Sequence, residues 1–162
     1  MEDLYGKVIL GIDPAIASIG YAAIRGQDVL DYGVIKTAAG TSIALRLRQI
    51  HDDICELCRL LQPEAVAVEM PFFTRENTNA NKVLRALGVI QLALGDSGLV
   101  DPIFLHQSQV KSAVAKYGAA KDEMQHAVAF LFDLPTPPRP DDAADALAIA
   151  YAAQLGMRAN VK

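Results

Sequence analysis

The sequence contains little cysteine, no long apolar run and no overall excess of positive charge, and each shortage argues against a class of protein. Two cysteines in 162 residues cannot form a disulfide framework, so the reducing cytoplasm is the expected compartment. The first residues, MEDLYGK, are acidic and lack the basic and apolar regions of a signal peptide. Polar or charged residues interrupt the longer apolar stretches, so we expect no membrane-spanning segment.

The two cysteines, Cys55 and Cys58, form a CxxC motif within a pattern of helical spacing. Such a pair could be half of a zinc site or a redox pair, but no second CxxC and no suitably spaced histidine pair completes a tetrahedral site. Cys58 shares one helical face with Ile54 and Leu61. The pattern therefore favours packing in the core.

The net charge of −4 by itself argues against a nucleic-acid partner, but the charges are unevenly distributed. Residues 71–121 contain six lysines and arginines against three acids, whereas the two flanks together contain nine against 16. A basic middle between acidic flanks is compatible with a DNA-facing surface beside an acidic site. A solvated helix face would show a similar pattern, so the distribution alone decides little.

Strand and helix patterns alternate along the chain in an order that predicts the fold class. Buried or strand-like runs cover 7–15, 19–26, 28–37, 63–70 and 102–106, and helical spacing covers 41–61, 77–97, 108–117, 121–132 and 141–155. A hairpin meander followed by right-handed crossovers gives an α/β fold with a mixed five-stranded sheet and helices on both faces. The proline-rich connector at 134–140 is too short to separate domains, so we expect a single domain over 1–162.

The last helical segment, within RPDDAADALAIAYAAQLG, begins with three aspartates close together. Asp141 follows Pro140 and is expected to cap the helix, and acids near a helix N-terminus interact favourably with its dipole. Asp145 instead shares a face with apolar residues, where a carboxylate is costly unless a cation or donor meets it. From periodicity alone, a metal or catalytic role and a satisfied buried acid are equally favoured.

Two further acids stand where ligands of such sheets gather. Asp13 ends the first predicted strand and Glu69 ends the fourth, at strand carboxyl ends. If those strands are parallel neighbours, Asp13, Glu69, Asp142 and Asp145 form one cluster, which cannot fully ionise without a cation. Oxygen ligands of this kind suit Mg²⁺ or Mn²⁺, and two such ions would support phosphodiester hydrolysis.

At these residues the sequence resembles a known family. ILGIDPAIASIGYAAI, AVAVEMPFF and RPDDAADALAIA are similar, in order and with compatible spacing, to signature segments of the RuvC-type Holliday-junction resolvases. The resemblance runs from about residue 7 to residue 155 and implies a ribonuclease-H-like fold. It also implies a Mg²⁺-dependent homodimeric endonuclease that makes paired nicks in four-way DNA junctions, with Asp13, Glu69, Asp142 and Asp145 as catalytic metal ligands.

The resemblance carries over candidate DNA-binding residues as well. Phe72 matches an aromatic that stacks on bases near the junction centre in the family, and Phe73 is its neighbouring candidate. Lys111 and Lys121 match basic positions implicated in DNA binding and catalysis. The remaining basic candidates of the middle segment are Arg75, Lys82 and Arg85. Without the family, the phenylalanines could be core residues and the lysines ordinary solvated side chains.

Symmetric cutting needs two active sites, so we expect a C₂ homodimer. The predicted helix at 77–97 is richer in apolar residues than one sheet face needs, and part of it is the expected interface; the residues considered are Val83, Leu84, Leu87, Ile90, Gln91 and Leu94. Whether a branch-migration helicase acts as a partner is left open by the sequence.

Departures from the family pattern leave alternatives in place. Ala15 replaces the usual glycine after GIDP, and Pro71 stiffens the segment leading to Phe72. A divergent branched-DNA nuclease with relaxed selectivity therefore remains an alternative, as does a non-catalytic junction-binding module. The run DPAIASIG lacks the phosphate turn of actin-like and sugar-kinase ATPases, which disfavours that class.

Overall fold

A computed structural model describes residues 3–71, 80–115 and 120–157. In these residues, five strands form one sheet in the order β3-β2-β1-β4-β5. The strands are β1 (Val8–Asp13), β2 (Ser18–Arg25), β3 (Asp28–Lys36), β4 (Ala65–Met70) and β5 (Ile103–His106). β1, β2 and β3 pair antiparallel, whereas β1, β4 and β5 run parallel. This is the predicted mixed five-stranded sheet, and the prediction is confirmed.

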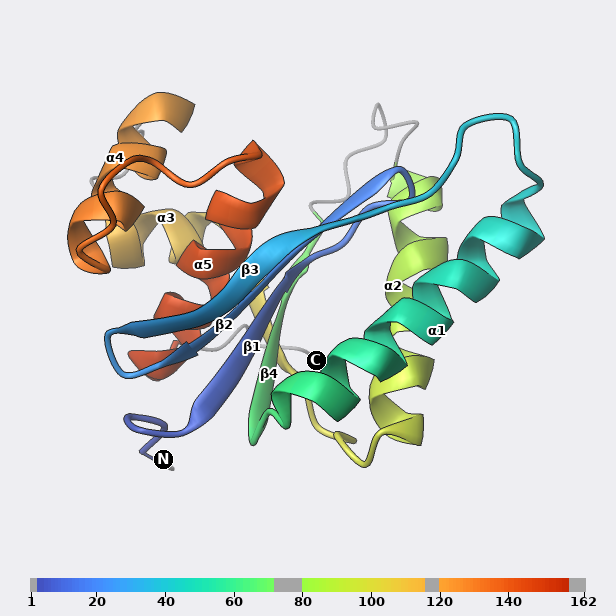
Figure 1. The fold of residues 1–162 in the computed structure, drawn as a ribbon, viewed down its shortest axis with the longest axis horizontal. Helices are drawn as coiled ribbons and strands as arrows, with labels where there is room; N and C mark the ends of the chain where they lie inside the picture. Colours follow the sequence, from blue (N-terminus) through green and yellow to red (C-terminus); the bar gives the residue numbers. More distant parts are fainter. Residues whose placement is uncertain (1–2, 72–79, 116–119, 158–162) are drawn as a thin grey trace.

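Five helices in the described part of the chain cover the two faces of the sheet. They are α1 (Ile43–Leu61), α2 (Ala80–Asp96), α3 (Gln107–Val114), α4 (Lys121–Leu131) and α5 (Asp141–Gln154). Figure 1 shows α1 and α2 on one face and α3, α4 and α5 on the other, with the sheet seen nearly edge-on between them. Each face buries its own apolar cluster, and the central strand β1 contributes to both, through Ile9 on one side and Leu10 on the other.

Helix α5 is the most completely buried of these helices. Its alanine-rich sequence lets it lie close against β1 and β2, and nine of its residues are buried. The approach also requires glycine in the strands. A Cβ built on Gly11 would overlap the Ala146 carbonyl oxygen, and one built on Gly20 would overlap the Asp142 carbonyl oxygen. Both glycines therefore set how closely α5 packs on the sheet.

The CxxC motif packs as the sequence predicts. Cys58 is buried in the cluster beneath α1 and α2, where burial raises the pKa of its thiol. The half-buried Cys55 thiol lies 3.6 Å from the Ala93 carbonyl oxygen of α2. Among the described residues, the groups of acids, histidines and cysteines close enough to hold a metal ion do not include this pair.

Helix α2, part of which is expected to form a dimer interface, uses much of its apolar surface within the chain. Of the residues considered for that interface, Leu87, Ile90 and Leu94 are buried and pack with α1 and the sheet. The outer face of the helix carries Leu84 and Leu92, which are 41% and 59% exposed. Any interface on α2 therefore has to use this outer face.

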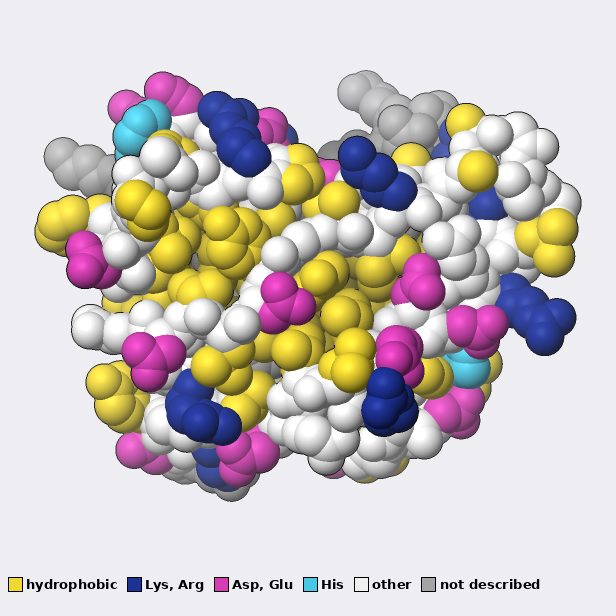
Figure 2. All heavy atoms as spheres, viewed as in Figure 1, with side chains coloured by type: hydrophobic (Ala, Val, Ile, Leu, Met, Phe, Trp, Pro, Cys, Tyr) yellow, Lys and Arg dark blue, Asp and Glu magenta, His cyan; other side chains and the backbone are white. Residues whose placement is uncertain are grey.

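One open edge of the sheet exposes apolar side chains. β3 is an edge strand, and Leu30 and Tyr32 on it are exposed. Figure 2 shows apolar side chains gathered along the region between the two helical layers, with charged side chains scattered around them.

Within the described residues, no helix is both long and apolar enough to cross a membrane.

Candidate active site

Three of the four predicted acids lie within reach of a single ion. Asp13 ends β1, and Asp142 and Asp145 lie in the first turns of α5. Each offers a carboxylate oxygen, and these oxygens all lie within 4.8 Å of one another. In Figure 1 the carboxyl ends of β1 and β4 and the start of α5 lie at the same end of the sheet. We call Asp13, Asp142 and Asp145 the acid cluster.

Glu69 joins this site from the neighbouring strand. β1 and β4 are parallel neighbours with Ile12 opposite Val68, so the next residues of the two strands, Asp13 and Glu69, lie side by side at this end of the sheet. Glu69 lines a cavity of about 240 Å³ together with Asp13 and Asp145, although it is not one of the three mutually close acids. The predicted convergence of four acids on one end of the sheet therefore holds, with Glu69 at a greater distance.

Burial and mutual repulsion shift the protonation of these acids. Burial, reinforced by the charges of Glu69, Asp145 and Asp142, raises the pKa of Asp13 to about 8. Burial and the charge of Asp145 raise the pKa of Glu69 to about 7, against the opposing effect of Lys111. Burial also raises the pKa of Asp145. Grouped oxygen donors with uncompensated negative charge fit a hard divalent cation.

A serine that the sequence did not single out completes the site. The Ser18 hydroxyl donates a hydrogen bond of 2.6 Å to Oδ2 of Asp142. The antiparallel pairing of β1 and β2 brings the start of β2 beside the end of β1, which places Ser18 next to the acid cluster. A serine at the start of a strand carries no chemical pattern of its own, so only the register of the sheet reveals it.

Two predicted basic residues also line the cavity. Lys111 of α3 and Lys121 of α4 face the acids, beside the apolar side chains of Val110 and Met124. Partial burial lowers the pKa of Lys121, but hydrogen bonding to Asp141 and the negative charge of nearby acids outweigh that effect and leave it raised. The cavity thus combines partly buried acids with two cations at its wall.

Asp141 does not cap α5 as predicted. The N-cap position is Pro140, with no side-chain capping bond, and Asp141 lies in the first turn of the helix. Its carboxylate accepts hydrogen bonds from Gln125 and Arg139 and pairs with Lys121. Proline before the helix shifts the N-cap by one residue, so the Asp141 side chain is directed to α4 rather than to its own backbone.

The other predicted DNA-binding residues are only partly placed. Lys82 and Arg85 are exposed on α2. Phe72, Phe73 and Arg75 lie outside the described residues.

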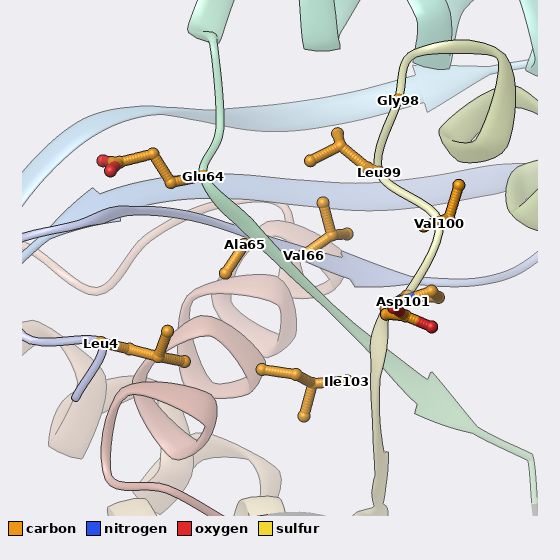
Figure 3. Close-up of a pocket in the computed structure, with 10 residues that line it drawn as sticks. Leu4, Glu64, Ala65, Val66, Gly98, Leu99, Val100, Asp101 and Ile103 are labelled. Carbon is orange, nitrogen blue, oxygen red and sulfur yellow. The ribbon is translucent and has the colours of Figure 1, made fainter. Parts of the chain in front are cut away.

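A second cavity, of about 420 Å³, lies at the opposite ends of β4 and β5. Figure 3 shows its two acids, Glu64 and Asp101, well apart from each other. The Glu64 carboxylate also accepts a hydrogen bond from the Val8 backbone N–H. This cavity therefore lacks the converging charged groups of the first one.

Comparisons with known proteins agree with the geometry. The profile of a family described as crossover junction endodeoxyribonuclease RuvC matches residues 9–153. The chain belongs to this family. It is 41% identical over 157 residues to the Synechocystis crossover junction endodeoxyribonuclease RuvC, covering 94% of this chain and 93% of that protein. It is 45% identical to a Synechococcus protein of the same name, covering 88% and 94% of the two chains.

A solved structure extends the similarity to the fold. The structure described as T. thermophilus RuvC in complex with Holliday junction substrate superposes with a TM-score of 0.83 at 37% identity, covering 93% of this chain and 96% of that one. The predicted ribonuclease-H-like fold is thereby confirmed. Membership of the family makes the chain an endodeoxyribonuclease by class.

Proposed function

We propose that this protein resolves four-way DNA junctions in recombination and repair, by paired, metal-dependent hydrolysis of phosphodiester bonds. The observation that carries the proposal is the acid cluster beside Glu69, Lys111 and Lys121, in a member of a junction-endonuclease family. The T. thermophilus relative is described in complex with a Holliday junction substrate, which supports the same substrate here. DNA as substrate supports a cytoplasmic location.

Asp13, Asp142 and Asp145 are the residues that would hold the cofactor, with Glu69 facing them across the cavity. We infer Mg²⁺, with Mn²⁺ as a substitute, and two ions per site, because the donors are all carboxylate oxygens. When bound, these ions would supply an activated water and charge stabilisation for the leaving oxygen. The hydrogen bond from Ser18 would hold Asp142 in one orientation.

The two lysines would act on the DNA backbone. Lys111 and Lys121 bring positive charge to the wall of a cavity that otherwise repels a phosphodiester, so we assign them to the phosphate next to the cut. Lys82 and Arg85 on the exposed face of α2, with Arg75, would contact backbone phosphates farther away. Phe72 and Phe73, by their likeness to the family motif, are proposed to stack on bases at the junction centre.

We further propose that the protein acts as a single-domain protomer in a homodimer, because one chain supplies one site and paired cuts need two. A branch-migration helicase is a candidate partner whose binding can be tested by co-sedimentation with the junction complex.

The decisive experiment compares a synthetic four-way junction with a linear duplex of the same sequence, each with Mg²⁺ or with a chelator. We expect paired nicks only in the junction and only with Mg²⁺. Asp145→Asn should bind the junction with nearly unchanged affinity and cut it at least about a hundredfold more slowly, because metal chemistry is lost while phosphate contacts remain.

Two outcomes would redirect the assignment. Equal cutting of junction and duplex would favour a branched-DNA nuclease of relaxed selectivity. Junction binding without any cutting, with Mg²⁺ and Mn²⁺ both present, would favour a non-catalytic junction-binding module.

A further inference from the structure

Asp141 lies next to the acid cluster in sequence but is directed away from it, toward α4 and the loop before α5. Its carboxylate contacts three side chains from two separate segments. Gln125 Nε2 donates to Oδ1 at 2.7 Å, and Arg139 Nη1 donates to the same oxygen at 2.8 Å. The Lys121 ammonium lies 3.2 Å from Oδ2. The two oxygens therefore have different partners.

The partners of Oδ1 fix the orientation of the carboxylate. Gln125 is only 4% exposed, and an amide that deeply buried needs a hydrogen-bond partner, which Asp141 provides. Because Gln125 and Arg139 hold Oδ1 from two directions, Oδ2 is left facing Lys121. Lys121 and Gln125 are one helical turn apart on α4, so one face of that helix holds both the anchor and the lysine.

Lys121 lies between a cavity and a groove on the protein surface. It lines the cavity that contains Asp13, Glu69 and Asp145, and it also lines an open groove bordered by Arg139, Pro140, Asp141 and Asp142. Its side chain is 59% exposed and long, so its position depends on what holds the ammonium. The negative charges of Asp145 and Asp142 attract it toward the cluster, while the pair with Asp141 holds it at the rim.

We propose that Asp141 is a positioning residue, which tethers the Lys121 ammonium at the rim of the acid cluster. Held there, the lysine faces the groove along which a phosphodiester can approach. Released, it would move onto the acids of the cluster and compete with a divalent cation for their oxygens. This role rests on the proposed cleavage function for its catalytic consequence, but the competition with a cation is a property of the protein alone.

Asp141→Asn is a sharp test because it is isosteric. The asparagine Oδ1 still accepts from Gln125 and Arg139, whereas its amide group replaces the oxygen that pairs with Lys121. We expect Mn²⁺ binding to the free protein, measured by calorimetry, to weaken by about threefold to fivefold, the scale of one partly exposed ion pair. Single-turnover cleavage should slow by roughly tenfold, with junction affinity changed by less than about twofold.

Two further variants test whether Asp141 acts through Lys121 and not simply through its charge. Adding Asp141→Asn to Lys121→Met should produce no further loss of Mn²⁺ affinity or cleavage rate, because the tethered group is already gone. Asp122→Asn removes an equal charge from the next residue of α4, which is exposed, and should leave both quantities unchanged.

Wild-type Mn²⁺ affinity and rate in Asp141→Asn would overturn the proposal. An equal loss of Mn²⁺ affinity and cleavage rate on adding Asp141→Asn to the wild type and to Lys121→Met would also overturn it, because Asp141 would then act without the lysine. If the wild type cuts no junction, the proposed function fails, while the Mn²⁺ measurements on the same variants still decide the role of Asp141.

Discussion

Asp13 is the residue whose charge the fold accommodates least well. Burial and three neighbouring acids raise its pKa from 3.8 to about 8. Between these values the folded protein keeps a proton that the unfolded chain has released. The contribution of Asp13 to the stability of the metal-free protein should therefore be fully present below about pH 4, decrease as the pH rises through this range, and be lost above about pH 8.

The first prediction at this scale is that Asp13→Asn stabilises the metal-free protein at pH 8, because an amide adds no charge to the cluster. In chelator, we expect its Tm to exceed the wild-type value by roughly 3–8 °C at pH 8, with the difference shrinking toward pH 4. Mg²⁺ should raise the wild-type Tm at pH 8 and leave the variant nearly unchanged. Calorimetric scans in matched buffers provide the measurement.

Asp28→Asn, at the exposed start of β3, serves as the control for removing one negative charge. A variant that is less stable than wild type at pH 8 in chelator would show that Asp13 is satisfied as an anion without a metal.

At the residue scale, the sequence predicted the acids that end a strand or break an apolar face. Core packing does not explain a charged residue at the end of an apolar strand or on an apolar helix face. This is why Asp13, Glu69 and Asp145 could be recognised. Ser18 and Gln125 could not be found in this way, because each is an ordinary polar residue whose partner lies far along the chain. The role of Asp141 was missed because an aspartate before a helix has a simpler local explanation.

At the scale of elements, the packing of α5 on the sheet positions half of the site. The backbone of α5 approaches β1 at Gly11 and β2 at Gly20 more closely than any side chain would allow. The carbonyl group that Gly20 meets belongs to Asp142, a member of the acid cluster. Because Gly20 has no side chain, the first turn of α5 can lie close to β2, and this close approach sets the position of Asp142 in the acid cluster.

Gly20→Ala should therefore damage the site as well as the fold. The new Cβ would have to displace the first turn of α5, since the contact is with backbone rather than with a movable side chain. We expect a loss of about 2–4 kcal/mol in the free energy of unfolding and a metal affinity at least about tenfold weaker in the protein that remains folded. Urea titration and calorimetry measure the two effects.

Gly33→Ala on β3 is the matched control, because its Cβ would meet the Tyr21 phenol, with the nearest atom at 3.0 Å, and that side chain can move aside. Unchanged metal affinity in Gly20→Ala would show that α5 tolerates the shift without moving Asp142.

The order and type of the elements were predictable because each strand is a short apolar run and each long helix has its own period. Which apolar residues of α2 face outward was predicted less well. Its apolar residues exceed what one sheet face requires, but α2 also packs on α1, and that second contact uses Leu87, Ile90 and Leu94. A helix pattern reports how much surface is apolar and not which neighbour covers it.

At the scale of the whole molecule, the outer face of α2 is the candidate contact between two copies. Leu84 and Leu92 lie two turns apart on that face, with Gly88 between them, where a Cβ would meet nothing within 4 Å. A partner helix could approach closely at this point. The same face also carries Lys82 and Arg85, which places the proposed DNA contacts beside the proposed two-fold axis.

Leu92→Glu should convert a dimer into a folded monomer, because two buried carboxylates would face each other across the axis. Sedimentation equilibrium should show the shift in mass, and the paired nicks in a junction should become single, uncoupled nicks. Leu60→Glu on α1 is the control, since Leu60 is 60% exposed and Leu92 is 59% exposed. A wild-type protein that sediments as a monomer yet cuts both strands together would rule out this interface.

The acids of the cluster come from opposite ends of the described chain, Asp13 from its first strand and Asp145 from its last helix. During synthesis, the strands from β1 to β5 leave the ribosome well before α5 does. A nascent chain that has not completed α5 therefore holds Asp13 and Glu69 but neither Asp142 nor Asp145, and it cannot form the acid cluster. We therefore expect chains that end before α5 to show no cutting activity, whatever else of the fold they form.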